Sequence, residues 1–95
     1  MKQKPKIIVI GSGIVGASIA MSCLNLGADV VVIERDNLGG SASSKSFGWI
    51  NASFAESTDY FKLRNAAVDK FRNIKKEINL NDCVKWQGTL WWEES

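Results

Sequence analysis

In the first third of the chain, apolar residues form three runs of different length. Residues 6–10, Lys-Ile-Ile-Val-Ile, are a short unbroken run that predicts a buried strand. Residues 14–26 are small or apolar on most of a helical circumference, which predicts a largely buried helix that ends at Gly27. Residues 29–34 contain Val-Val-Val-Ile, which is typical of a parallel strand covered on both faces. Together the three runs predict a β-α-β unit.

The middle of the chain follows a helical period. From Ser57 to Asn79, apolar residues recur at steps of three and four and predict a long amphipathic helix; they are Leu63, Ala67, Phe71, Ile74 and Ile78. The start of this helix has two interpretations. Ser53 and Glu56 have the spacing of a capping box, whereas Ser57 or Thr58 could cap a later start.

Residues 84–93 alternate between two faces, with Trp86, Gly88 and Trp92 on the same face. This period of two predicts a half-buried strand, bent or bulged at Gly88. One such strand needs a sheet to join, and the third parallel strand of an ordinary dinucleotide domain is missing from the pattern. The sequence is therefore interpreted as the amino-terminal part of a larger protein, with a nucleotide-binding lobe at 1–80 and the start of a truncated substrate-domain sheet at 81–95.

Composition narrows the chemistry that the chain can support. Its 95 residues carry a net charge of +2, with acids and bases interspersed after residue 56, which gives no electrostatic case for nucleic acid. The absence of histidine excludes Ser-His-Asp catalysis, Cys-His catalysis and imidazole metal sites within these residues. No acids have metal-ligand spacing, so a bound cofactor is expected to carry the chemistry. Cys23 and Cys83 predict buried or semi-buried thiols in a reduced, cytoplasmic setting.

A secretory signal is an alternative interpretation of the amino terminus. Lys2, Lys4 and Lys6 precede an apolar stretch that reaches Cys23. Three glycines at the spacing of residues 11, 13 and 16 are not what such a signal needs, and removal of the stretch would leave the strand at 29–34 without a partner. The apolar run is also too short and too rich in glycine to span a membrane. The pattern therefore favours a folded domain.

A glycine-rich sequence, Gly11-Ser12-Gly13-Ile14-Val15-Gly16, joins the first strand to the helix. Its first glycine allows a tight turn, its second lets a pyrophosphate approach the backbone, and its third lets the helix pack close to the strand. The unpaired N–H groups and the dipole of the helix favour an anion at the same point. Glu34 ends the second strand, where a carboxylate can accept hydrogen bonds from a ribose diol. Incidental glycines in an ordinary strand–turn–helix are the alternative, which the order of the elements disfavours.

Residues 39–51 form a second segment rich in glycine and serine. The hydroxyls within residues 43–46 can donate to phosphate oxygens, and Lys45 can neutralise charge. Residues 47–49, Phe-Gly-Trp, could offer an apolar wall to a flat ring. By composition alone, a flexible surface loop is an equally good interpretation.

Three separated motifs, at residues 11–16, 34–36 and 42–51, appear in order at plausible spacing. In this order they resemble the amino terminus of FAD-dependent oxidoreductases of the D-amino-acid oxidase, glycine oxidase and sarcosine oxidase type. Residues 86–90, Trp-Gln-Gly-Thr-Leu, are similar to the point where that family enters its substrate-domain sheet. The resemblance covers nearly the whole chain and implies an α/β, Rossmann-like FAD-binding unit.

The resemblance also implies a set of cofactor-binding residues, in which glycines frame the pyrophosphate, helix-start backbone lies beside it, and acidic, basic, hydroxyl and aromatic groups reach the other parts of FAD. These are Gly11, Gly13 and Gly16 at the pyrophosphate, Ile14 and Val15 at the helix start, Glu34 at the ribose, Arg35 beside the adenine, Ser43 and Ser44 at the pyrophosphate, and Phe47, Gly48 and Trp49 near the flavin. The family often has glycine at the positions of Ser41 and Ser44, where this chain adds Cβ atoms to a crowded loop. No catalytic or metal-binding residue is assigned; at helical spacing, Tyr60, Lys62 and Arg64 are expected to be solvated or to lie in the core.

The function implied by the resemblance is oxidation of a C–N bond in an amino acid or related amine, with hydride passing to flavin N5. The groups that orient such a substrate are expected outside these residues or in a partner chain, so the chain alone is expected to be inactive. Two alternatives stay open. One is part of an NAD-dependent dehydrogenase, because Glu34 also suits NAD. The other is a non-catalytic chain that acts with a partner or self-associates through its Trp-rich end.

Overall fold

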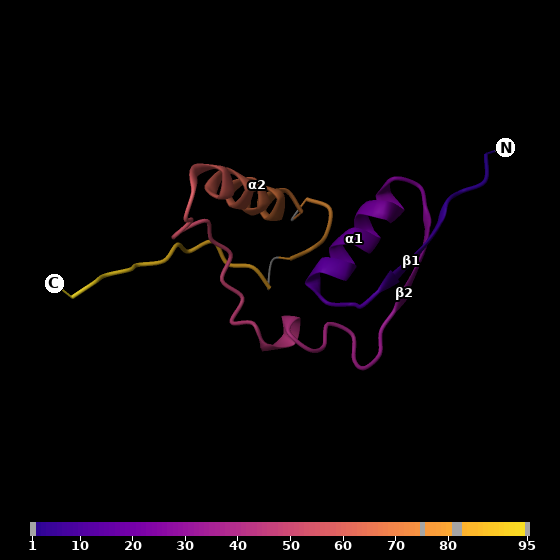
Figure 1. Cartoon of the computed structure of the whole chain (residues 1–95), viewed down its shortest axis with the longest axis horizontal. Helices are drawn as coiled ribbons and strands as arrows, with labels where there is room; N and C mark the ends of the chain where they lie inside the picture. The colour runs from indigo at the N-terminus through magenta and orange to yellow at the C-terminus, as the bar shows by residue number, and fades with distance from the viewer. Residues whose placement is uncertain (1, 75, 81–82, 95) are drawn as a thin grey trace. The chain divides into compact units, whose positions relative to one another are not determined.

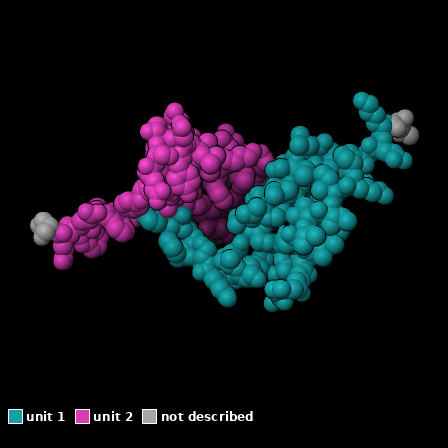
Figure 2. Space-filling view, in the orientation of Figure 1, with its two compact units in different colours: residues 1–49 teal, residues 50–95 magenta. Residues whose placement is uncertain are grey.

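The computed structural model describes residues 2–74, 76–80 and 83–94. The chain consists of two compact units, which we call unit 1 (Met1–Trp49) and unit 2 (Ile50–Ser95) (Figure 2). The predicted helix included Lys75, and the predicted domain boundary lies at residue 81; both positions fall outside the described residues. The division into lobes at 1–80 and 81–95 stays a prediction.

Unit 1 contains the predicted β-α-β unit. Strand β1 (Lys6–Ile10) leads into helix α1 (Ile14–Asn25), and strand β2 (Asp29–Ile33) follows (Figure 1). The strands pair in parallel, in a register that runs from Lys6 opposite Asp29 to Ile10 opposite Ile33. Parallel pairing brings the carboxyl ends of both strands to the same edge, beside the turn that starts α1. An α/β fold of the Rossmann-like kind is therefore confirmed for this unit.

Helix α1 ends where the sequence predicts, through a Schellman motif. Leu26 is the C-cap, and Gly27 follows it with φ of +88°, a conformation that favours glycine. The Gly27 N–H donates to the Leu24 carbonyl at 2.9 Å, and the Ala28 N–H donates to the Cys23 carbonyl at 3.0 Å. These two bonds satisfy carbonyls that would otherwise lack partners, and they direct the chain back into β2.

The core of unit 1 is smaller than the sequence predicts. Its buried apolar residues are Val9, Ala20 and Ala28. Helix α1 was predicted to be largely buried, yet Val15 is 69% exposed; β2 was predicted to be covered on both faces, yet Val31 is 58% exposed. Both predictions are wrong for this structure. Within unit 1, α1 packs against one face of the two strands, so one side of the helix and one face of the sheet stay uncovered by these elements. The apolar pattern predicts more burial than the elements of unit 1 provide.

Unit 2 contains helix α2 (Thr58–Ile74). The Ser57 hydroxyl accepts a hydrogen bond from the Tyr60 N–H at 3.2 Å, which confirms the later of the two predicted starts. The helix ends before the predicted Asn79. The Lys76 N–H donates to Asn73 and the Glu77 N–H to Ile74, both at 2.9 Å, so the α-helical period gives way to tighter turns.

The predicted strand over residues 84–93 is not formed; this segment has no regular secondary structure. An alternating pattern forms a strand only with a neighbour to complete its hydrogen bonds, and the described part of unit 2 contains no strand. Aromatic contacts fix the segment locally instead. Trp91 meets Phe54 edge-on with ring centroids 5.2 Å apart, and the Arg72 guanidinium lies 5.1 Å from the centroid of the Trp86 ring.

The two cysteines differ in environment. Cys23 lies half-buried in α1, whereas Cys83 is exposed, which corrects the prediction that both are buried or semi-buried. Both are free thiols, as expected. Among the described residues, neither helix is both long enough and apolar enough to cross a membrane.

Candidate functional site

The turn between β1 and α1 has the close packing that its glycines predict. Gly11 has φ of +100°, and its N–H donates to the Ile33 carbonyl at 2.8 Å, which fastens the turn to the end of β2. A Cβ atom on Gly16 would lie 2.0 Å from the Gly11 carbonyl oxygen, a separation that no side chain tolerates. Only glycine therefore permits α1 to start this close to the strand.

Gly13 is the N-cap of α1 and has no side chain with which to cap the helix. The first helical N–H, that of Ile14, donates to the Ser43 hydroxyl at 2.9 Å. A Cβ atom on Gly13 would lie 2.9 Å from the same hydroxyl oxygen. The serine-rich segment thus folds back to the positive end of the α1 dipole, where an anion is favoured. Gly13, Ile14 and Ser43, three of the predicted site residues, are thus brought together.

The Glu34 carboxylate lies at the end of β2 and accepts three hydrogen bonds. Its Oε2 accepts from the Ser12 hydroxyl at 2.7 Å and from the Ser12 N–H at 2.8 Å. Its Oε1 accepts from the Asp36 N–H at 3.1 Å. The Ser12 hydroxyl, then the Ser12 and Asp36 N–H groups, lower the pKa of Glu34 from 4.5 to about 2. The carboxylate is therefore ionised and acts only as an acceptor near neutral pH.

Sequence reasoning missed Ser12 and Gly39 as members of the site. Ser12 is buried, and both its hydroxyl and its carbonyl oxygen accept from the Gly39 N–H at 3.2 Å. Ser12 therefore joins the glycine turn, the Glu34 carboxylate and the start of the second segment. The available signal was a hydroxyl residue between two fingerprint glycines, with an acid at the end of the next strand.

Other predicted site residues do not converge on the turn. The Ser44 hydroxyl donates to the Ser41 carbonyl at 2.8 Å, within its own loop. Ser41 has φ of +56°, a conformation that favours glycine, and this agrees with the position being one where the family often has glycine. The Arg35 side chain is exposed and pairs with Asp36 at 3.2 Å. Val15 is largely exposed at the start of α1.

The aromatic segment follows the 3₁₀ helix η1 (Ser43–Lys45) at the end of unit 1. The Phe47 and Trp49 rings lie 6.4 Å apart between centroids, at an interplanar angle of 39°. Gly48 separates them with φ of +68°, and its N–H donates to the Ser46 hydroxyl at 3.0 Å. Phe47 is exposed, whereas Trp49 is half-buried. The segment thus presents the aromatic surface of Phe47.

A glycine turn, a helix N-terminus and a carboxylate that could accept from a ribose lie at one edge of the sheet. This arrangement agrees with the result of a comparison with protein families. The model of the family DAO, FAD dependent oxidoreductase, matches residues 6–95. The chain belongs to the FAD-dependent oxidoreductase family. FAD is the cofactor of this family, which confirms the predicted cofactor and favours it over NAD.

Curated relatives of this FAD-dependent oxidoreductase chain are much longer than it is. It is 31% identical over 88 residues to D-amino acid dehydrogenase 3 of Mesorhizobium japonicum, and the match covers 92% of this chain but 21% of that protein. It is 30% identical over 77 residues to a fumarate reductase (cytochrome) of Shewanella frigidimarina, covering 80% of this chain and 14% of that protein. The chain thus spans about a fifth or less of the relatives that it matches.

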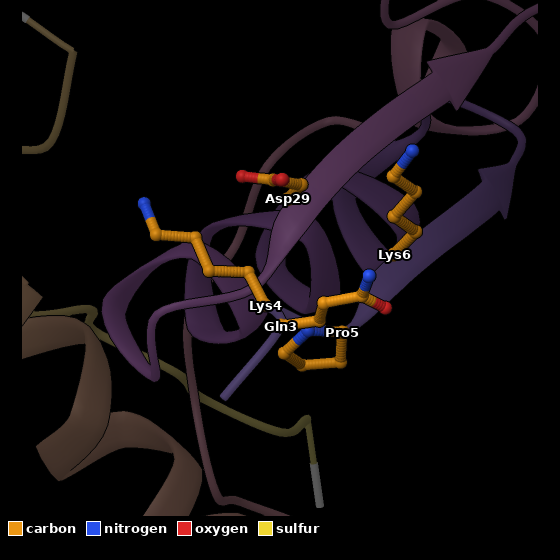
Figure 3. Close-up of a pocket in the computed structure, with 5 residues that line it drawn as sticks. All are labelled: Gln3, Lys4, Pro5, Lys6 and Asp29. Carbon is orange, nitrogen blue, oxygen red and sulfur yellow. The ribbon is translucent and has the colours of Figure 1, made fainter. Parts of the chain in front are cut away.

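One shallow pocket lies at the opposite edge of the sheet. It is lined by Gln3, Lys4, Pro5, Lys6 and Asp29, around the amino ends of β1 and β2 (Figure 3). Ligands of open α/β sheets bind at the carboxyl ends of the strands. This pocket contains none of the predicted site residues, so the candidate FAD site of this family member is the edge with the glycine turn.

Proposed function

We propose that this chain is the FAD-binding part of a flavin-dependent oxidoreductase that oxidises C–N bonds of amino acids or related amines. One observation carries the proposal. The glycine turn, the first N–H of α1, the Ser43 hydroxyl and the ionised Glu34 carboxylate meet at the carboxyl edge of the sheet. This combination suits an anionic pyrophosphate next to a ribose diol.

The absence of side chains at the glycines of the turn suits a dinucleotide, because its pyrophosphate can approach the backbone there. Gly16 leaves no space for a Cβ atom, and Gly13 keeps the approach to the helix N-terminus free of one. In the proposed site, glycines and helix-start backbone frame the pyrophosphate, serines donate to it, Glu34 accepts from the ribose, Arg35 lies by the adenine and the aromatic segment by the flavin. The residues are Gly11, Gly13, Ile14, Val15, Gly16, Glu34, Arg35, Ser43, Ser44, Phe47, Gly48 and Trp49. Bound FAD would supply the hydride acceptor of the reaction.

The substrate class rests on the relatives. The D-amino acid dehydrogenase of Mesorhizobium japonicum matches 92% of the chain, and its name indicates an amino-acid substrate. The fumarate reductase match is shorter, at 80% of the chain, and its name indicates that a similar sequence also occurs in a protein with a different reaction. We propose that the substrate-orienting groups lie outside the 95 residues. The proposed division is an FAD lobe at 1–80 and the start of a substrate domain at 81–95. The proposed location of the protein is the cytoplasm.

The test is a visible absorption spectrum of the purified chain after incubation with FAD and desalting. Retention of one flavin per chain is the expected result. A thermal-shift titration with FAD and with NAD separates the cofactors, because a ligand that binds only the folded state raises the melting temperature. A folded chain that retains no flavin, or one stabilised more by NAD, would contradict the proposal.

A further inference from the structure

The carboxy-terminal segment of unit 2, residues 84–93, exposes a backbone edge that a strand could join. The segment runs without a helix or strand (Figure 1). Within the described part of unit 2, the last backbone hydrogen bond runs from the Val84 N–H to the Leu80 carbonyl at 3.0 Å. Residues 85–93 are all exposed. Their backbone donors and acceptors are therefore open to a neighbouring strand.

The same segment carries large aromatic side chains at the surface. Trp91 is 61% exposed and Trp92 is 74% exposed. Two contacts hold the segment on unit 2, namely Trp91 against Phe54 and Trp86 against Arg72. These contacts anchor the segment at two points without covering it. Exposed aromatic surface next to an open backbone edge favours association with another chain.

The side chains of the segment complement those of a second copy in antiparallel orientation. When a twofold axis relates two identical strands, a residue before the centre lies opposite the residue equally far after it. With Thr89 at the centre, Lys85 lies opposite Glu93 of the second copy, and Trp86 lies opposite its Trp92. The symmetry makes each contact twice. Opposite charges and aromatic pairs are among the cross-strand contacts that stabilise a sheet.

The neighbouring registers lack these matches. Opposite residues of an antiparallel pair lie on the same face of the sheet, so the centre of a symmetric pair falls on a residue and not between two. A centre at Gly88 places Lys85 opposite Trp91, and a centre at Leu90 leaves Glu93 without a basic partner. The charges therefore select Thr89 from these three centres.

We propose that residues 84–93 bind the same residues of a second copy as an antiparallel strand pair centred on Thr89. The inference goes beyond the proposed function and does not depend on FAD binding. Gly88 has φ of +77°, which interrupts the extended backbone. Because glycine adopts left-handed and extended conformations with similar ease, the segment can straighten on pairing. The pair completes the hydrogen bonds that an alternating segment needs in order to form a strand.

The first test measures the monomer–dimer dissociation constant by sedimentation velocity over a range of concentrations. The unmodified chain should dimerise. Lys85→Glu places like charges opposite each other at both ends of the pair and should raise the dissociation constant about tenfold. Adding Glu93→Lys to this variant restores both pairs and should return the constant to within about threefold of its original value. Lys76→Glu, the matched control, changes the net charge equally at an exposed position outside the segment and should have little effect.

A cysteine at the centre tests the register itself. In a background of Cys23→Ser and Cys83→Ser, Thr89→Cys places two thiols directly opposite each other, and mild oxidation should give a disulfide-linked dimer. Gln87→Cys is the matched control on the same face of the strand. Its two copies would lie four residues apart along the pair, roughly 13 Å, which is too far for a disulfide. This control should therefore stay monomeric under the same oxidation.

Three outcomes would overturn the inference. The first is a chain that stays monomeric at every concentration, and the second is cross-linking of Gln87→Cys as efficient as that of Thr89→Cys. The third is association that the charge reversal at Lys85 leaves unchanged, because apolar surfaces would then adhere without this register. FAD retention is measured separately and is unaffected by these outcomes, so a failure of the pairing is distinguishable from a failure of the proposed function.

Discussion

The sheet of unit 1 and the carboxy-terminal segment of unit 2 differ in whether an extended segment has a strand to pair with. Strands β1 and β2 each have five residues and pair with each other in parallel. Residues 84–93 are longer and richer in tryptophan, yet they form no ladder. The comparison teaches that β-propensity and alternation are insufficient alone, because a strand is stabilised by cross-strand pairs and ladder hydrogen bonds.

The tightest point of unit 1 is where we expect the largest effect. Gly16→Ala would place its Cβ 2.0 Å from the Gly11 carbonyl oxygen, which backbone atoms cannot avoid without moving α1 off the sheet. We expect destabilisation at or above the upper end of the roughly 1–3 kcal/mol that overpacking usually costs, and loss of FAD retention. Urea denaturation followed by circular dichroism measures the first effect.

Gly27→Ala is the matched control for this substitution. It adds the same methyl group at φ of +88°, but the added atom meets nothing within 4 Å. It should cost about 1 kcal/mol, the typical penalty of a left-handed conformation. If Gly27→Ala proved as damaging as Gly16→Ala, close packing at the turn would not be what distinguishes the two positions.

The next effect concerns the Glu34 carboxylate, which joins the glycine turn to the segment after β2. Glu34→Ala removes the acceptor proposed for the ribose and leaves both Ser12 donors without their partner. We expect FAD affinity to fall about tenfold or more, as for the loss of a hydrogen bond to a charged group. Isothermal titration with FAD measures it. Asp36→Ala keeps the backbone N–H that bonds Glu34 and serves as control; equal losses in both variants would contradict the role of the carboxylate.

A smaller effect is expected in unit 2, where Arg64 links helix α2 to residues 51–53 by hydrogen bonds. Arg64 Nη1 donates to the Ser53 carbonyl at 2.7 Å, and Nη2 donates to the Asn51 side-chain oxygen at 3.0 Å. Arg64→Ala should therefore cost about 1–2 kcal/mol. Lys62→Ala removes only an exposed ion pair to Asp59 at 3.6 Å and should cost less than about 0.5 kcal/mol. Thermal melts that ranked the two variants equally would show that Arg64 does not fasten residues 51–53.

Sequence patterns predicted the parts of the molecule whose partners lie close in the chain. The turn glycines, the Ser57 cap and the β1–β2 pair all depend on neighbours within about thirty residues, so local chemistry specifies them. Burial of α1 and formation of a strand at 84–93 depend on further layers of structure, which a local pattern indicates but cannot supply. The Ser12–Glu34 contact lies between these cases. Both residues were visible in the motif, but the direction of a serine hydroxyl is set by three-dimensional packing.

The smallest expected effect is the dependence of unit 1 on pH. Glu34 has a folded-state pKa of about 2, below its ordinary 4.5, chiefly because of the Ser12 hydroxyl. A lowered pKa means that the unfolded state takes up the proton first, so the ionised carboxylate contributes stability above about pH 4.5 and this contribution is lost as the pH falls towards 2. The melting-temperature difference between the unmodified chain and Glu34→Gln should therefore be constant near neutral pH and shrink between these values. In Ser12→Ala the folded-state pKa of Glu34 should lie nearer its ordinary 4.5, because the hydroxyl that chiefly lowers it is gone, so the stability that this carboxylate contributes should be smaller and its loss should be complete at a higher pH. A difference that stayed constant down to pH 2 would mean that the Glu34 carboxylate gains nothing from the turn, and the stability of unit 1 would then rest on packing alone.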